Sequence, residues 1–239
     1  MTAHKGRDLW PTWSPDGTRL AFASSRRGNR NLFVKQADGS GKATELLISP
    51  NSRQYPNDWS RDENTLLFMQ LAPDDASDLF YLRRRDDRSG YEEIPFRSSD
   101  AHEGPAQLSP DGRFLAYVSD ESGQPEVYLC AFPEGEGKQR ASVSGGGQPR
   151  WRADGKELFY VEGHSLMSVA VSAYPSFTVG PPVRLFESEG LESPVTFSYD
   201  VSPDGERFVL PEMVEESDTI VRVTQNWYAE FKGRDGEAE

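Results

Sequence analysis

The chain has little of what usually marks a disulfide-rich, membrane or nucleic-acid-binding protein. Its 239 residues include one cysteine, Cys130, so no internal disulfide can form, and nothing beside this thiol suggests activation. No apolar run approaches the length of about 20 residues that spans a membrane, and residues 1–10 contain no signal-peptide stretch. The formal net charge of −13 argues against binding to a phosphate backbone. We therefore expect no membrane or nucleic-acid partner and, for the chain as written, a cytoplasmic location.

Motifs of enzymatic chemistry are also missing. The three histidines do not occur in H-E-x-x-H or at the spacing of a zinc site, and no G-x-S-x-G occurs. The run 145–147 is three glycines, but it precedes an expected strand and not a helix, so it forms no phosphate cradle. From these absences we predict a non-enzymatic protein with no cofactor, no metal and no catalytic residue.

What the chain does have is a repeated turn. It reads W-S-P-D-G at 13–17, and related copies occur at 59–63, 108–112, 151–155 and 201–205. The aspartates are 46, 49, 43 and 50 residues apart, a period typical of propeller blades. Serine, proline, aspartate and glycine in this order favour a type I turn, in which the aspartate bonds nearby backbone amides. We therefore assign a structural and not a catalytic role to the aspartate of each copy, namely Asp16, Asp62, Asp111, Asp154 and Asp204.

Short apolar runs follow every turn, as at 20–23 and 114–118, and a second strand and a weaker outer strand come after them. No amphipathic helix separates the units. The pattern predicts an all-β fold, a β-propeller of about five four-stranded antiparallel blades. Trp13, Trp59 and Trp151 should anchor its core. We expect one domain over 1–232 and a disordered acidic tail over 233–239, with blades at about 9–50, 55–97, 103–144, 147–188 and 194–232.

The last unit looks incomplete. After a clear strand at 219–224, only residues 225–231 remain to supply an outer strand. An unpaired strand edge invites association, so we predict either self-association through this incomplete blade or a chain that is part of a longer propeller.

Segments that lead into the innermost strands of a propeller gather around its central channel. Their polar groups could converge on a cation, a sugar or a charged peptide end, although an ordinary hydrated channel mouth would use the same residues. The binding candidates at this channel mouth are Asp8, Tyr55, Asp58, His102, Glu103, Gln148, Arg150, Tyr199 and Asp200.

The W-S-P-D-G turn followed by an L-A-F or L-A-Y strand resembles the TolB-like, WD-like propeller repeat. Residues 13–24, 122–128, 148–160 and 226–230 are also similar to the C-terminal propeller of bacterial transmembrane serine/threonine kinases. The resemblance covers about 8–231, but the chain has no glycine-rich loop, H-R-D or D-F-G, and no transmembrane segment precedes the first blade. It implies a sensor or interaction module, which would be extracytoplasmic if excised from such a kinase.

Our prediction from sequence is thus a non-enzymatic binding or interaction module whose protein or small-ligand partner is unknown. The first alternative is a hydrolase or lyase that uses the channel-mouth carboxylates and His102 with a bound metal. The second is a degenerate propeller that was once attached to a peptidase or a kinase.

Overall fold

A computed structural model describes residues 4–173, 177–191, 198–213 and 219–225. All regular elements in these ranges are β-strands, and no helix that could span a membrane occurs in them. Short apolar runs separated by turns every few residues leave no length for a helix, as the sequence predicts. The all-β prediction is therefore confirmed.

The strands form five antiparallel sheets, which we call blades 1 to 5. Blades 1 to 3 each have four strands in sequential order. Their strands are β1 (Asp8–Trp13), β2 (Arg19–Arg27), β3 (Asn29–Gln36) and β4 (Thr44–Leu47); β5 (Arg53–Trp59), β6 (Thr65–Leu71), β7 (Ser77–Arg84) and β8 (Tyr91–Arg97); and β9 (Glu103–Leu108), β10 (Phe114–Ser119), β11 (Glu126–Ala131) and β12 (Gln139–Arg140).

Blades 4 and 5 depart from this order. In blade 4 two outer strands pair with the same third strand, and blade 5 has three strands among the described residues. The strands are β13 (Gly147–Trp151), β14 (Glu157–Glu162), β15 (Ser165–Ser172), β16 (Thr178–Val179) and β17 (Val183–Glu187); and β18 (Asp200–Val201), β19 (Arg207–Met213) and β20 (Thr219–Gln225). The outer strand expected at 225–231 and the tail expected at 233–239 fall almost wholly outside the described residues.

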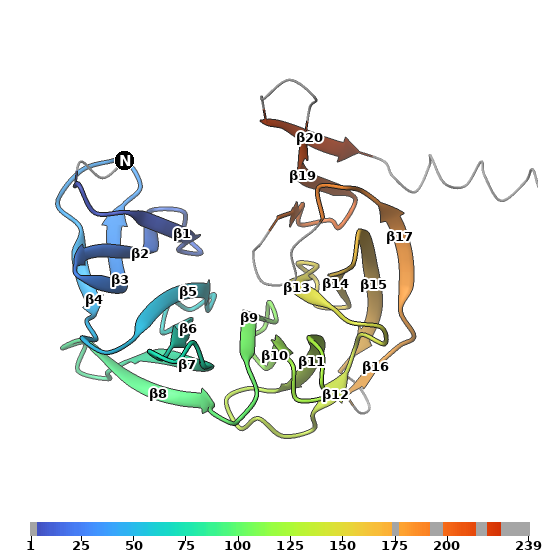
Figure 1. The fold of residues 1–239 in the computed structure, drawn as a ribbon, viewed down its shortest axis with the longest axis horizontal. Helices are drawn as coiled ribbons and strands as arrows, with labels where there is room; N and C mark the ends of the chain where they lie inside the picture. Colours follow the sequence, from blue (N-terminus) through green and yellow to red (C-terminus); the bar gives the residue numbers. More distant parts are fainter. Residues whose placement is uncertain (1–3, 174–176, 192–197, 214–218, 226–239) are drawn as a thin grey trace, which may run out of the picture.

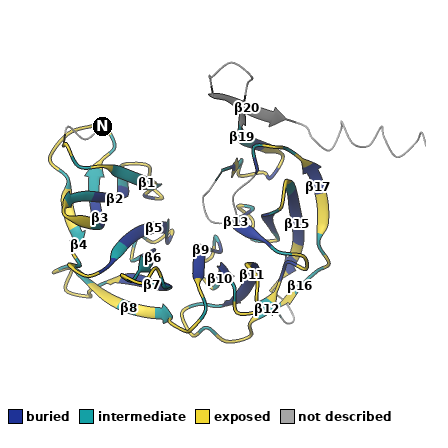
Figure 2. Cartoon of the chain, viewed as in Figure 1, coloured by how far each residue is buried: buried dark blue, intermediate teal, exposed yellow. Residues whose placement is uncertain are grey.

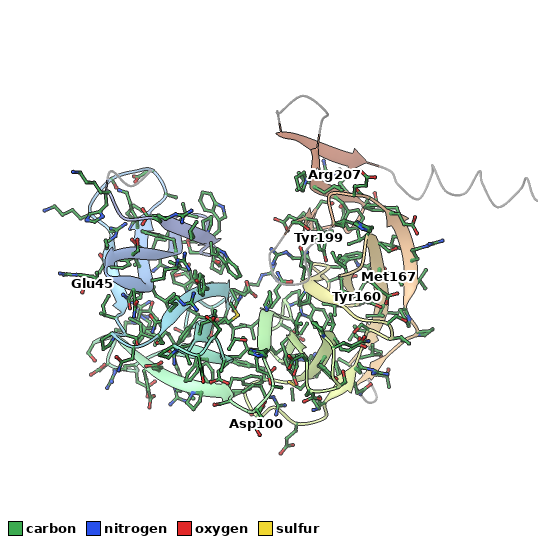
Figure 3. The ribbon with its side chains drawn as sticks, in the orientation of Figure 1. Glu45, Asp100, Tyr160, Met167, Tyr199 and Arg207 are labelled. Atoms are coloured by element: carbon green, nitrogen blue, oxygen red, sulfur yellow. The ribbon has the colours of Figure 1, made fainter. Side chains whose placement is uncertain are left out.

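Figure 1 shows the blades side by side around a central opening, with the first strand of each blade innermost. The ring is open between blade 1 and blade 5. Buried residues concentrate in the inner and middle strands, while the outer strands β8 and β17 are more exposed (Figure 2). In Figure 3, Tyr160 and Met167 lie within blade 4, whereas Glu45 and Asp100 point outward from the rim.

The repeated turn has the expected hydrogen bonds. In blade 1 the Gly17 N–H donates to the Ser14 carbonyl at 2.8 Å, and the Asp16 carboxylate accepts from the Ser14 hydroxyl at 2.5 Å and the Thr18 N–H at 3.0 Å. These donors hold the pKa of Asp16 below its usual range. In blade 2 Glu63 takes the place of Gly17 and still adopts a left-handed φ of 61°, which is uncommon for a residue with a side chain.

The blades pack face to face in one repeated way. Each blade has a front face, which carries the residue before its turn, and a back face on the other side of the same strands. The front face of blade 2, with Trp59, Leu66 and Phe68, packs on Ala21 and Leu32 from the back face of blade 1. The same arrangement recurs at the three other interfaces. Blade 3 packs Leu108, Leu115 and Tyr117 on Leu67, Met69 and Leu79 of blade 2, and blade 4 packs Trp151, Leu158 and Tyr160 on Ala116, Val118 and Leu129 of blade 3. Blade 5 packs Val201, Phe208 and Leu210 on Phe159, Val161 and Leu166 of blade 4.

The three turn-site tryptophans therefore differ in environment. Trp59 and Trp151 are 5% and 6% exposed, which confirms them as core anchors. The same prediction for Trp13 is wrong, because its side chain is 58% exposed. The physical reason is its place in the ring: Trp13 lies on the front face of blade 1, and no described blade packs against that face.

Candidate functional site

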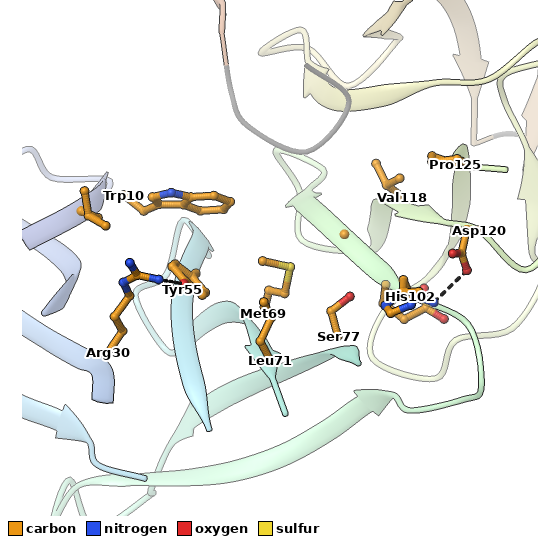
Figure 4. Close-up of a pocket in the computed structure, with 13 residues that line it drawn as sticks. Trp10, Arg30, Tyr55, Met69, Leu71, Ser77, His102, Val118, Asp120 and Pro125 are labelled. Atoms are coloured by element: carbon orange, nitrogen blue, oxygen red, sulfur yellow. Dashed lines mark hydrogen bonds between the residues drawn. The ribbon is translucent and has the colours of Figure 1, made fainter. Parts of the chain in front are cut away.

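A pocket of about 470 Å³ opens beside the central channel, where the inner strands of blades 1, 2 and 3 meet (Figure 4). Most of its wall is apolar, with a few polar groups at one end, which is the usual character of a small-molecule site. Its lining residues are Leu9, Trp10, Arg30, Tyr55, Met69, Leu71, Ser77, His102, Glu103, Gly104, Val118, Asp120 and Pro125.

Two aromatic rings form one wall of this pocket. Trp10 and Tyr55 have ring centroids 5.0 Å apart and lie at 50° to each other. Trp10 has a left-handed φ of 54° at an irregularity in the β1–β2 pairing. Bulges of this kind re-aim a side chain. Arg30 donates a hydrogen bond to the Tyr55 hydroxyl and lies over the Tyr55 ring, so the wall combines aromatic surface with one fixed positive charge.

The opposite end is polar. Glu103, the first residue of β9, is 2% exposed. Its Oε1 accepts a hydrogen bond from the Ser99 hydroxyl at 3.3 Å, whereas its buried Oε2 has no partner of hydrogen-bond geometry among the described residues. The backbone N–H of His102 donates to the Asp120 carboxylate at 2.8 Å, which fixes the loop before β9. A buried acceptor without a partner is costly, so this environment disfavours the charged form of Glu103.

Burial raises the pKa of Glu103 to about 7, although the nearby serine hydroxyls and the charge of Arg97 favour the ionised form. The group can therefore hold or release a proton near neutral pH. Such a perturbed carboxyl group in a pocket is typical of functional sites.

We expect Glu103→Gln to stabilise the protein at pH 8 by about 1 kcal/mol or more, after allowance for residual hydration. The folded-state pKa lies above the ordinary value of 4.5, so the folded state binds the proton more tightly. The stabilising contribution of the Glu103 proton is therefore fully present below pH 4.5 and is lost as the pH rises through 7. Urea denaturation at pH 4.5 and pH 8 measures the difference. Asp100→Asn on the outer rim removes the same charge as a control, and an equal gain from it would contradict the prediction.

The pocket brings together only part of the predicted channel mouth. Tyr55, His102 and Glu103 line it. The other six candidates do not, and the described residues give most of them partners within or between blades. Asp8 forms an ion pair with Arg26 at 3.1 Å in blade 1. Arg150 lies 3.7 Å from Asp200, Tyr199 donates a hydrogen bond to the Gln148 carbonyl at 3.0 Å, and Asp58 accepts one from the Leu108 N–H at 2.9 Å.

These partners reveal a structural device that repeats. Asp58, Gln107 and Arg150 each lie four residues before the aspartate of their turn. Asp58 and Gln107 accept hydrogen bonds from the backbone N–H of Leu108 and Trp151, at 2.9 and 2.6 Å, in the next blade. Arg150 likewise contacts the next blade, where it forms an ion pair with Asp200. Polar groups at this position therefore hold neighbouring blades together. Asp58 lies at this contact, and burial raises its pKa to about 6.

Sequence reasoning missed Trp10, Arg30 and Asp120. Trp10 lies six residues before Asp16, and Gln148 lies six residues before Asp154 with a similar left-handed φ of 55°. Gln148 is one of the predicted channel-mouth residues, so aligning the repeats would have placed Trp10 at the same position in blade 1. Arg30 comes from a hairpin in blade 1 and carries no such signal.

No group of three or more histidine, cysteine, aspartate or glutamate side chains that could hold a metal ion occurs within the described ranges. Cys130 is buried, and burial raises the pKa of its thiol.

Comparison with known proteins identifies the class of fold. TolB from Acinetobacter baumannii superposes with a TM-score of 0.68 at 18% identity, over 94% of this chain and 53% of that one. Puromycin hydrolase superposes with a TM-score of 0.62 at 16% identity, over 92% of this chain and 37% of that one. The chain thus has the β-propeller fold that TolB also has, as the sequence predicts. The similarity to kinase propellers stays a prediction.

At the level of sequence, no family model matches. The chain is 28% identical over 157 residues to a Bacillus subtilis protein named uncharacterized peptidase YuxL, which covers 64% of this chain and 22% of that protein. The chain therefore spans about a fifth of this relative and about half of the TolB chain.

These comparisons correct the prediction that the protein is not an enzyme. A relative named as a peptidase and a structural neighbour named as a hydrolase point to propellers that belong to enzymes. The prediction was wrong because it relied on short motifs. The residues of a propeller site come singly from several blades and form no short motif. The absence of such motifs therefore does not exclude an enzyme.

Proposed function

We propose that this chain is the substrate-holding propeller of a peptidase-like hydrolase, and that the pocket between Trp10, Tyr55 and Glu103 binds the substrate. The carrying observation is the buried Glu103 carboxyl group, which lines a mostly apolar pocket and whose pKa is raised to about 7 by burial. The peptidase relative and the hydrolase neighbour support the reaction class.

The shape and chemistry of the pocket fit the end of a peptide. Trp10, Tyr55 and Met69 offer a surface for an apolar or aromatic side chain. An amide N–H or an amino group of the same ligand would donate to Glu103. A volume of about 470 Å³ lies in the range of small-ligand sites, so one or two residues of a peptide fill it.

Binding is tested with tripeptides that carry a terminal phenylalanine or leucine, compared with triglycine, by calorimetry and thermal shift. We expect the apolar tripeptides to bind and to raise the melting temperature with concentration. Tyr55→Ala should weaken binding, and Glu103→Gln should weaken it about tenfold, since loss of a hydrogen bond to a charged or buried group costs about 1–3 kcal/mol. Asp100→Asn is the matched charge control and should bind normally.

Cleavage is followed in the same samples by mass spectrometry. Turnover would show that the cleaving groups lie within these 239 residues, and binding without turnover would assign this chain to substrate recognition within a longer enzyme. If no peptide binds, or if binding is indifferent to both Tyr55→Ala and Glu103→Gln, the proposal is wrong.

A further inference from the structure

A second pocket, of about 730 Å³, lies at the other end of the strands from the pocket of the proposed function. The first pocket is bounded by the beginnings of innermost strands, whereas this one is bounded by the repeated turns of blades 2, 3 and 4 and by the end of β15. We call it the turn-side pocket. Its volume lies in the range of small-molecule sites, and its lining includes Arg61, Asp111, Arg113, Phe114, Asp154 and Lys156.

The two carboxylates in this wall are already bound within their own turns. Asp111 accepts hydrogen bonds from the Ser109 hydroxyl at 2.6 Å and from Arg113 Nε at 2.7 Å. Asp154 accepts bonds from Nε and Nη2 of Arg152, at 2.9 and 2.7 Å. Each carboxylate therefore has a guanidinium group that balances its charge.

Two cations of the same pocket are left over. In the part of the chain that the structure describes, neither Arg61 nor Lys156 forms an ion pair. Lys156 lies near Asp154, but that carboxylate is already bound to Arg152. The pocket thus has an excess of positive charge in a chain whose formal net charge is −13. This local excess favours an anionic ligand.

The turns do not need these two side chains. Arg61 stands where the turns of blades 1, 3 and 5 have proline, which presets the backbone of such a turn. At the position of Lys156, the side chains of residues 18, 64 and 113 bond to the aspartate of their own turn. In blade 4 Arg152 makes this bond instead. The ammonium group of Lys156 is therefore available to a ligand.

Aromatic surface adjoins these charges. Phe114 lines the pocket, and its ring stacks on that of Phe177, with centroids 4.3 Å apart and an angle of 15°. The Arg113 guanidinium lies 5.5 Å from the centroid of the Phe114 ring. Pro110 and Val171 add further apolar surface. The pocket therefore offers apolar contact for the body of a ligand and positive charge for its anionic group.

We propose that the turn-side pocket binds a small organic phosphate, whose phosphate group contacts Arg61 and Lys156 and whose apolar part lies on Phe114. A phosphate monoester carries a charge of about −1.5 to −2 at pH 7, which matches two cations. Arginine binds phosphate through paired N–H groups, and lysine binds it as a point charge. The two pockets share no lining residue, so this proposal does not depend on the proposed hydrolase function.

Calorimetric titration of the purified chain with phenyl phosphate tests the proposal. We expect binding that weakens as the salt concentration rises, because salt screens exposed charges. Inorganic phosphate lacks the apolar part and benzyl alcohol lacks the anion, so each should bind at least about tenfold more weakly. Equal binding of phenyl phosphate and benzyl alcohol would show that the cations play no part and would overturn the proposal.

Substitutions locate the site. Arg61→Ala and Lys156→Ala should each weaken the binding of phenyl phosphate about tenfold, the factor expected for loss of a hydrogen bond to a charged group. Both side chains are exposed, so the melting temperature should stay the same. Arg85→Ala is the matched control, because Arg85 is an exposed arginine of blade 2 outside the pocket, and it should bind normally. If phenyl phosphate does not bind, or binds both pocket variants as tightly as the unmodified chain, the proposal is wrong.

Discussion

Replacing Trp59 by alanine should lower the free energy of unfolding by about 3–5 kcal/mol, whereas the same change at Trp13 should cost the monomer less than about 1 kcal/mol. The two residues occupy the same repeat position but differ in exposure, at 5% and 58%. Trp59 packs between blades 1 and 2, and its ring lies 4.8 Å below the Arg19 guanidinium. Its loss leaves a cavity, while Trp13 leaves only solvent-facing surface.

Urea denaturation of both variants at a protein concentration too low for self-association measures this difference. The pair is its own control, because the chemical change is identical. Similar losses at the two sites would contradict the assignment of front faces, and a small loss at Trp59 would show that blades 1 and 2 are not packed as described.

Glu126→Ala should destabilise the protein by about 3–5 kcal/mol, because removal of one partner from a buried charged network leaves the others unpaired. Glu126 is fully buried at the start of β11. It accepts hydrogen bonds from the Gln124 side chain at 2.7 Å, the Gly145 N–H at 3.2 Å and the Ser142 hydroxyl. These bonds hold the loop between blades 3 and 4 against blade 3.

Thermal and urea unfolding of Glu126→Ala, Glu126→Gln and Glu121→Ala separate the contributions. Glu126→Gln keeps the shape of the side chain but replaces one accepting oxygen by an NH₂ group, which faces the donors of the network. We therefore expect an intermediate loss of stability. Glu121 makes a surface ion pair with Lys138 at 2.5 Å, and its removal should cost less than about 1 kcal/mol. A loss at Glu126 no larger than that at Glu121 would show that the network contributes nothing to the loop.

The fold was predictable because its signals are local. Each turn is fixed by residues within five positions of one another, as the bonds of Ser14, Asp16 and Thr18 show, and the strand after it follows from a short apolar run. Repetition of this unit then indicates the propeller. Exposure of Trp13 was not predictable in this way, because it depends on whether another blade covers the face.

The site was only partly predictable because it depends on register and bulges. Tyr55 and Asp58 are three residues apart, yet Tyr55 lines the pocket and Asp58 bonds to the next blade. An irregularity in the β5–β6 pairing between Pro56 and Asp58 separates them. A polar residue near an innermost strand can therefore serve either the channel or the neighbouring blade, and its sequence position does not decide which.

The fasteners at Asp58 and Gln107 run in one direction, from each blade to its successor, and the main contacts between described blades join blades that are neighbours in the sequence. The described blades therefore stabilise one another chiefly as neighbours in a row. In such arrays stability is close to a sum of unit terms and nearest-neighbour terms. A whole blade can be gained or lost at either end by gene duplication or deletion at the cost of a single junction, so propellers of different sizes can descend from one repeat while the middle blades keep their geometry.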